Sequence, residues 1–406
     1  MTQVDAGKAH GEQSRSSLHG GAAIAAALGI MLVAANLRPA VVSVSPLIDT
    51  ISDSFGFSNG TAGLLTALPV LFFGISAPVA PRLAHHYGIE RTIFGALAVL
   101  VAGIALRLVP DAFALFGGSV LIGIGIGVCN VVLPALIKRD FAHRSGLMTG
   151  LYSMTLSGGA AVAAGLTVPI DDAVGGRWRL TLAAWGLLVL VAMVQWLPQL
   201  RRVHTVPSSR PSAGLWRDRT AWAITVYMGA QSLIFYTFGA WLPTFLMDEA
   251  GMTSGAAGGV LAAGQTVGLT CSLLAPIIAG RFADQRVITL AALGICVLGF
   301  VGLLTVHGWW VLWAGLIMVG PGCGIGLALL FMVLRSNSTM QAGQVSGMAQ
   351  AVGYGLAAIG PILIGAVHDV TGSWTVAMAV LTCAAIPQGL AALRAARVGK
   401  MAPDTP

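Results

Sequence analysis

The stretch that decides the fold is AAIAAALGIMLVAANLRPAVVSVSPL, residues 22–47. It contains a single charged residue, Arg38, near its middle. A helix needs about 20 apolar residues to cross the hydrocarbon core of a bilayer. The stretch therefore predicts a membrane span that carries one cation among apolar side chains.

The composition extends this prediction to the whole chain. Hydrophobic residues make up 56% of the 406 residues and charged residues only 9%, whereas soluble domains carry about 25% charge. We therefore predict an all-α membrane protein with twelve transmembrane helices. The predicted spans are residues 22–47, 61–83, 91–109, 113–137, 146–170, 179–198, 221–246, 256–279, 287–306, 309–334, 345–367 and 374–393.

The basic residues predict the orientation of these spans. Of the 22 Lys and Arg residues, Arg38 is in a span and only Arg107, Arg177 and Arg179 are assigned to outer connections. The other 18 fall in the inner connections and the termini, which places both termini in the cytoplasm by the positive-inside rule. The net charge of +7 follows this loop pattern, so we predict no nucleic-acid partner.

The two halves of the chain repeat. Gly123-x-Gly125-x-Gly127 recurs as Gly322-x-Gly324-x-Gly326, and Ser145-Gly146-Leu147-Met148 recurs as Ser346-Gly347-Met348. Parallel repeats place a site at the midplane between halves, and the glycines predict close helix packing. We predict two pseudo-symmetric six-helix bundles, 20–198 and 220–394, joined by a cytoplasmic linker, 199–219, with cytoplasmic tails 1–19 and 395–406.

Arg38 is the first candidate for a functional residue. An arginine at mid-membrane costs about 2.5–3.5 kcal/mol on insertion scales and normally faces a protein interior or a wet cavity. None of the long apolar runs holds an Asp or Glu as a partner. We predict that Arg38 anchors a substrate; the alternative is a structural arginine bonded to backbone carbonyls and Asn36.

With twelve spans, a repeat and a central linker, the chain resembles a major facilitator superfamily transporter from Ala22 to about Arg394. The family's loop motif, roughly Gly-x-x-x-Asp-Arg-x-Gly, is matched at its start by Gly280-Arg281-Phe282-Ala283-Asp284-Gln285-Arg286. In the first half, Pro81-Arg82-Leu83-Ala84-His85-His86-Tyr87-Gly88 has His85 in place of the acid. The resemblance implies conformational roles for Arg82, Gly88, Arg91, Gly280, Arg281, Asp284 and Arg286.

Within that superfamily the chain is similar to the cyanate permease and nitroimidazole transporter group. The residues that carry this similarity are Asn36-Leu37-Arg38-Pro39, the loop from His85 to Arg91, and the seventh span from Gln231 through Tyr236 to Trp241-Leu242-Pro243. The resemblance implies alternating access in a bacterial inner (cytoplasmic) membrane, with small-molecule substrates and the lipid bilayer as partners.

The resemblance implies a cavity among the first, fourth, seventh and tenth spans, with the second, fifth, eighth and eleventh beside them. Polar side chains inside these spans are the candidates for the substrate site, because a wet cavity removes the cost of burying them unpaired. The candidates are Arg38, Asn36, Asn130, Tyr152, Gln231, Tyr236, Gln265, Gln350 and Tyr354. Asn130 can equally bond a neighbouring helix. One fixed cation among amides and phenols favours a small anion, because arginine binds planar anions through two parallel hydrogen bonds.

We therefore predict a secondary active transporter for a small anionic or polar solute, such as a cyanate-like anion, a small carboxylate or a nitroimidazole-like compound. The alternative is an efflux carrier for larger amphipathic compounds, with a cavity lined by Phe72, Phe73, Phe235, Phe238 and Phe331. The five cysteines have no metal-ligand spacing, and no nucleophile–base pair appears in the runs. We predict a monomer without cofactor, metal or enzymatic activity.

Overall fold

The computed structural model describes residues 20–57, 59–201 and 214–402, and within these ranges every regular element is a helix. The predicted tail 1–19 and most of the predicted linker lie outside the described residues. The α-helices are α1 (Gly20–Ala35), α2 (Pro39–Val42), α3 (Ile48–Phe55), α4 (Asn59–Ser76), α5 (Ala80–Tyr87), α6 (Ile89–Leu106), α7 (Ala112–Asp140), α8 (Ser145–Ala173), α9 (Trp178–Trp196), α10 (Arg219–Ala250), α11 (Ser254–Ala279), α12 (Arg286–Thr305), α13 (Trp310–Arg335), α14 (Thr339–Thr371), α15 (Trp374–Thr382) and α16 (Ala385–Ala395).

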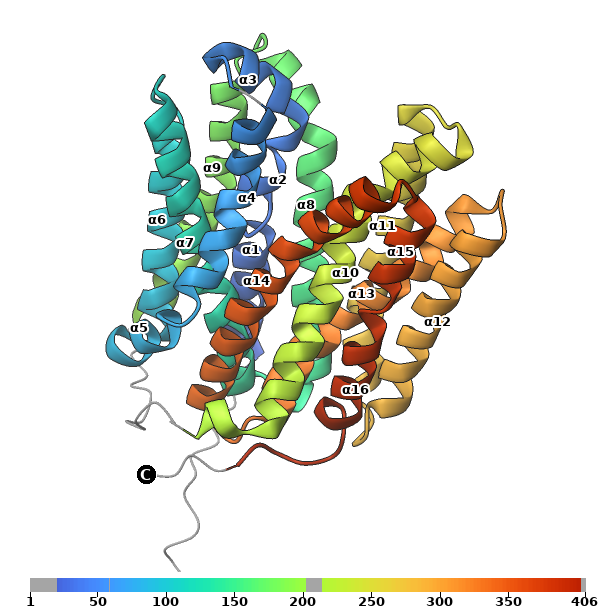
Figure 1. Ribbon diagram of the computed structural model, residues 1–406. Coiled ribbons are helices and arrows are strands. Elements are labelled where there is room, and N and C mark those ends of the chain that lie inside the picture. The colour runs from blue at the N-terminus through green and yellow to red at the C-terminus, as the bar shows by residue number, and fades with distance from the viewer. Residues whose placement is uncertain (1–19, 58, 202–213, 403–406) are drawn as a thin grey trace, which may run out of the picture.

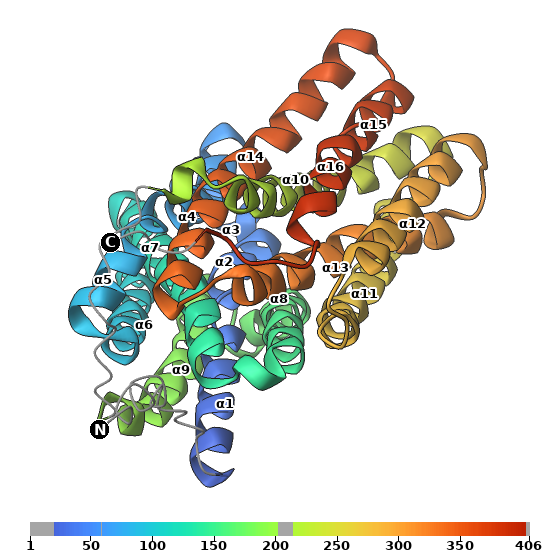
Figure 2. The same cartoon turned by 90° about the horizontal axis from the view of Figure 1, so that it is seen from below.

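The helices form two groups that lie side by side. Figure 1 shows α5, α6, α7 and α9 on one side of the molecule and α11, α12, α15 and α16 on the other. The view from below in Figure 2 places α5, α6 and α9 at one side and α11, α12 and α15 at the other. Helices α8 and α14 lie between the groups, because α8 packs against α11 and α14 packs against α4 and α7.

Ten helices in the described part of the chain are long and apolar enough to cross a membrane, or eleven if α4 and α5 count as one bent span. The predicted spans correspond to these, except that the seventh, α10, is not among them. Gln231, Ser232 and Tyr236 lower the hydropathy of α10. Its length of 32 residues nevertheless exceeds the roughly 20 that a span requires.

The first predicted span, 22–47, is not one continuous helix. α1 ends at Ala35, three residues form a turn, and α2 begins at Pro39. Pro39 lacks an N–H group and disfavours the helical conformation in the residue before it, and Arg38 has φ −124° at this point. The break therefore places Arg38 on irregular backbone at the start of α2.

Two further predicted spans are interrupted inside their bounds. The second span, 61–83, bends by 55° between the segments Leu64–Ser76 and Ala80–Tyr87, and the last span is divided into α15 and α16. The motif at Ser346-Gly347-Met348 does not open its helix, because α14 already begins at Thr339. The matching motif does open α8, which begins at Ser145.

The repeated glycines permit close helix packing, as predicted. A Cβ atom on Gly125 would lie 2.6 Å from the carbonyl oxygen of Ala96 in α6. In the second group, a Cβ on Gly322 would lie 2.4 Å from the carbonyl oxygen of Gly268 in α11. Such distances leave no room for a side chain, so helix backbones approach at these positions as small residues in membrane helices allow.

Candidate functional site

Arg38 connects the two groups of helices at the centre of the molecule. Its Nη1 donates to the hydroxyl of Tyr236 in α10 at 2.8 Å, and its Nη2 donates to the hydroxyl of Tyr354 in α14 at 3.3 Å. Arg38 is half-buried, whereas Tyr354 is buried. In the described residues no hydrogen bond joins the guanidinium to a backbone carbonyl or to Asn36, the alternative that the sequence left open.

An aromatic ring completes the immediate surroundings of Arg38. Its guanidinium carbon lies 5.9 Å from the ring centroid of Phe73 in α4, within the range of a cation–π contact. Phe73 in turn packs edge-on against Tyr354, with 5.4 Å between centroids. Among the residues that the structure describes, no carboxylate forms a salt bridge with Arg38.

Three other predicted site residues form a second cluster, which joins α7, α8 and α14. The Tyr152 hydroxyl donates to Asn130 Oδ1 at 3.3 Å, and Gln350 Nε2 donates to the Asn130 backbone carbonyl at 2.7 Å. Tyr152 also lies near both Arg38 and Tyr354. Among the described residues the buried Nδ2 of Asn130 has no hydrogen-bond partner, so this donor is unsatisfied.

The remaining predicted site residues lie elsewhere. The Asn36 amide donates to the carbonyls of Leu32 at 2.7 Å and Leu188 at 3.3 Å. Gln231 is buried and donates to Ser232 Oγ at 2.7 Å. Gln265 is half-buried on α11. In the part of the chain that the structure describes, none of these three forms a hydrogen bond or ring contact with Arg38, whereas Tyr236, Tyr354 and Phe73 do.

The two groups of helices meet closely at one end. A Cβ on Gly146, at the start of α8, would lie 2.5 Å from the carbonyl oxygen of Pro276 in α11. A Cβ on Gly347, near the start of α14, would lie 2.9 Å from the carbonyl oxygen of Ala77, which follows α4. Backbone therefore contacts backbone at both crossings, and we call this end the closed end.

The opposite ends of α8 and α11 are apart. A Cβ added to Gly165, near the end of α8, or to Gly258, near the start of α11, would have no neighbouring atom of the described residues within 4 Å. In Figure 1 the two groups diverge toward the top of the view, where the upper ends of α8 and α11 lie apart. Access to Arg38 from this opposite end, which we call the open end, agrees with its partial exposure.

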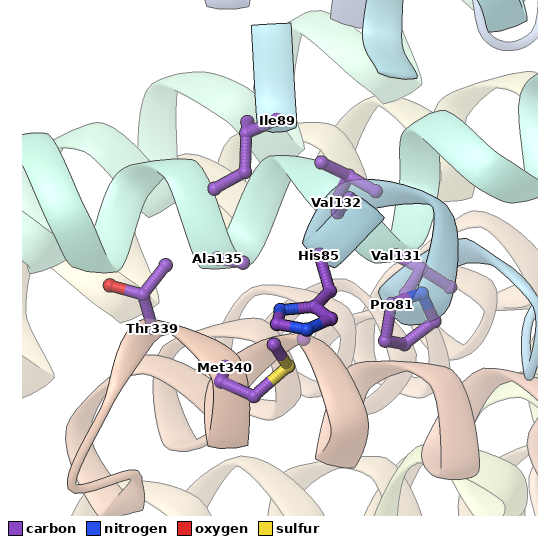
Figure 3. Close-up of a pocket in the computed structure, with 10 residues that line it drawn as sticks. Pro81, His85, Ile89, Val131, Val132, Ala135, Thr339 and Met340 are labelled. Carbon is purple, nitrogen blue, oxygen red and sulfur yellow. The ribbon is translucent and has the colours of Figure 1, made fainter. Parts of the chain in front are cut away.

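A small crevice lies at the closed end between α5, α7 and the start of α14. Its lining is mostly apolar, and Figure 3 shows His85 in it beside Met340, with Pro81 and Val131 nearby. His85 occupies the position where the family motif has an acid. The histidine thus lies at the contact between the two groups of helices, on an exposed part of α5.

The charge contact of the first-half loop is made by a residue that the sequence reasoning missed. Arg139 at the end of α7 donates to Glu90 Oε1 at 2.7 Å and also to Asp140. Glu90 is buried and lies five positions after His85. The signal in the sequence was an acid in the first turn of a helix that follows Gly88, whose φ of +88° favours glycine.

The second-half loop makes a related contact. Arg335 at the end of α13 donates to Gln285 Oε1 and to the carbonyls of Ala395 and Ala396. The neighbouring Asp284 accepts from Arg286 at 2.6 Å, and these hydrogen bonds lower the pKa of Asp284 to about 2. Arg82, Arg91 and Arg281, the other basic residues of these loops, are exposed.

The described residues contain no group of three His, Cys, Asp or Glu side chains that could hold a metal ion. The geometry instead defines a half-exposed cation on broken backbone, phenols and amides around it, and helices that meet at one end only. These are features of a membrane transport protein.

The chain belongs to the major facilitator superfamily, because the model of that family matches residues 20–361. It is 39% identical over 373 residues to the uncharacterized transporter YycB of Bacillus subtilis (91% of this chain, 92% of that protein). It is 38% identical to the 2-nitroimidazole transporter of Escherichia coli (89% and 92%) and 32% identical to the cyanate transport protein CynX of the same species (86% and 91%).

The fold agrees with this assignment. The proton:xylose symporter XylE superimposes with a TM-score of 0.74 over 91% of this chain and 94% of that chain, at 13% identity. The predicted superfamily, its subgroup and the helical membrane fold are therefore confirmed. The chain is a multi-pass membrane transporter rather than an enzyme, since its family and relatives are transporters.

Proposed function

We propose that this transporter moves a small anionic or polar solute across the bacterial inner membrane by alternating access, with Arg38 as the substrate anchor. The solute class includes cyanate-like anions, small carboxylates and nitroimidazole-like compounds. The relatives are named for 2-nitroimidazole and for cyanate, and both are small enough for a site formed by a few side chains.

The observation that carries the proposal is the set of partners around Arg38. The guanidinium reaches two phenol hydroxyls, Tyr236 and Tyr354, and no carboxylate among the described residues. A phenol is a neutral partner, so the positive charge is solvated but not neutralised. An anion binds a guanidinium more strongly than a neutral hydroxyl does, and would therefore replace one or both phenols.

The proposal includes the arrangement of the chain in the membrane. Two bundles, 20–198 and 220–394, are joined by the linker 199–219, and the termini lie in the cytoplasm by the distribution of basic residues. Because α8 begins after Arg144 and α11 ends before Arg281, the closed end is the cytoplasmic one. The molecule is then in an outward-facing state, and we propose that it acts as a monomer.

A ligand panel tests the proposed function. Purified protein in detergent is heated with cyanate, nitrate, formate, short carboxylates, 2-nitroimidazole and lipophilic cations, for the wild type and Arg38→Ala. A ligand at 100 times its Kd stabilises the folded protein by about 2.7 kcal/mol. At least one anion is expected to raise Tm in the wild type, and Arg38→Ala is expected to lower its affinity at least tenfold, since charged hydrogen bonds contribute about 1.5–3 kcal/mol.

The control is Arg219→Ala, which removes an exposed arginine at the start of α10 and is expected to leave the affinity unchanged. The panel also tests the alternative, an efflux carrier for amphipathic compounds. If only lipophilic cations stabilise the protein, and do so equally in the wild type and Arg38→Ala, the anion proposal fails. Of the rings that this alternative requires as cavity lining, Phe238 and Phe331 are fully buried, whereas Phe73 contacts Arg38.

A further inference from the structure

The inference concerns Arg107, which directly follows α6. The sequence placed it in an outer connection, but its side chain is only 1% exposed. Its Nη1 donates to the carbonyl of Ala40 in α2 at 2.7 Å, and its Nη2 donates to Ser119 Oγ in α7 at 2.8 Å. Arg107 thus joins α6 and α7 to the short helix that begins immediately after Arg38.

Arg107 is a costly residue at this position. In the described part of the chain it forms no salt bridge, and its Nε is buried without a hydrogen-bond partner. A buried guanidinium without a carboxylate is unfavourable. A methionine of similar length would avoid that cost, so stability of the helix packing alone is a poor explanation for an arginine here.

Close backbone packing makes room for this side chain. A Cβ on Gly118 in α7 would lie 2.9 Å from Arg107 Cγ and 2.5 Å from the carbonyl oxygen of Gly103 in α6. Ser119, the next residue, passes its own hydroxyl hydrogen to the Leu115 carbonyl at 2.8 Å. Ser119 Oγ is therefore oriented to accept from Arg107, and the guanidinium is directed toward α2.

Helix α2 needs such an anchor. It has four residues, about one turn, and a single turn is unstable in isolation because nucleation fixes several dihedrals for one hydrogen bond. On the other side of the break, the Asn36 side chain is bonded to the carbonyl of Leu188 in α9. Arg38 therefore lies between two attachments, Asn36 to α9 and Ala40 to Arg107.

We propose that Arg107 is a positioning residue for the substrate site. By binding the Ala40 carbonyl it holds α2, and through α2 it keeps the Arg38 guanidinium between Tyr236 and Tyr354. This inference rests on the proposed function of Arg38. Among the described residues Arg107 donates to Ala40 and Ser119 and not to either tyrosine, so its effect on a ligand is transmitted through Arg38.

A double-mutant cycle on purified full-length protein tests the inference, with 2-nitroimidazole and cyanate as probes. Arg107→Met is expected to lower affinity at least fivefold in the wild-type background. In Arg38→Lys the loss is expected to be less than twofold, because lysine lacks the two terminal nitrogens by which Arg38 contacts Tyr236 and Tyr354. Arg107→Lys, which can reach one of the two acceptors, is expected to retain part of the affinity. Arg177→Met, which alters an exposed arginine, is the control and is expected to have no effect.

A second measurement does not depend on the ligand. Hydrogen exchange of the amides of residues 40–44, relative to those of α9, is expected to be at least tenfold faster in Arg107→Met and unchanged in Arg177→Met. Ser119→Ala keeps the charge of Arg107 but removes one of its two acceptors. Its exchange rate is expected to lie between those of Arg107→Met and Arg177→Met, and it replaces Arg107→Met in the test if that variant does not fold.

The outcomes separate the inference from the proposed function. Equal loss of affinity in both backgrounds, or unchanged exchange in residues 40–44, overturns the role of Arg107 while leaving Arg38 as the anchor. If Arg38→Lys and Arg38→Ala bind both probes as well as the wild type, the proposed function of Arg38 fails. In that case faster exchange of residues 40–44 in Arg107→Met would still show that Arg107 holds α2. Unchanged exchange there would refute this role of Arg107 as well.

Discussion

Valine in place of Gly146 is expected to lower the transport rate about a hundredfold. The added Cβ would lie 2.5 Å from the Pro276 carbonyl oxygen and 3.1 Å from the Gly280 Cα. Both neighbours are backbone atoms, which cannot rotate away as a side chain can. Overpacking costs about 1–3 kcal/mol, and the upper end of that range shifts a conformational equilibrium by roughly 150-fold.

The measurement is uptake of radiolabelled cyanate or 2-nitroimidazole by proteoliposomes, together with the distance between spin labels at Ala142 and Phe282. The labels lie beside the closed end and are expected to separate in Gly146→Val. The matched control is Gly165→Val in the same helix, where an added Cβ would have no atom within 4 Å. Unchanged uptake and an unchanged label distance in Gly146→Val would show that this crossing tolerates a side chain.

Leucine in place of Glu90 is expected to lower the free energy of unfolding by about 2–3 kcal/mol. Breaking a buried ion pair by removing one partner costs roughly 3–5 kcal/mol, but Arg139 keeps its contact with Asp140 and its side chain is 18% exposed. The expected loss therefore lies below that range. At about 2–4 °C per kcal/mol for a large domain, Tm should fall by about 4–12 °C in a thermal scan of detergent-solubilised protein.

Two controls define this result. Glu249→Leu removes an exposed acid at the end of α10 and should change Tm by less than about 2 °C, since surface substitutions usually lie within about 0.5 kcal/mol. The double variant Glu90→Leu with Arg139→Leu should lose less stability than the sum of the two single losses, because the Glu90–Arg139 contact is lost only once, although Asp140 then also lacks its partner. Losses that simply add would show that Glu90 and Arg139 do not act as a pair.

Long apolar runs were sufficient to predict the helical membrane fold, because about 20 apolar residues are what a helix needs to cross the bilayer. The phenols near Arg38 were also predicted, as polar groups are rare inside such runs. The repeat of glycines predicted close packing correctly. Each of these signals can be found in the sequence without knowing which helix becomes the neighbour.

The missed features depend on tertiary contacts. Arg107 looks like a loop residue, and only the packing of α6 against α7 at Gly118 turns it inward. Glu90 replaces the acid that the loop motif lacks at His85, but its partner Arg139 is 49 positions away. The sequence predicts a bend at Pro39, but not the three-residue break between α1 and α2, because the hydrophobicity of residues 22–47 continues through it.

The polar character of α10 affects how the protein is assembled. Tyr236 and Gln231 make this helix less apolar than α11, α13 and α14, and its most extensive contacts are with α14, which is synthesised later. Release of a helix from the translocon into lipid depends on its own hydrophobicity. α10 therefore gains much of its stability in the bilayer only after α14 has emerged from the ribosome, so substitutions in the α10–α14 contact would reduce membrane insertion and protein yield.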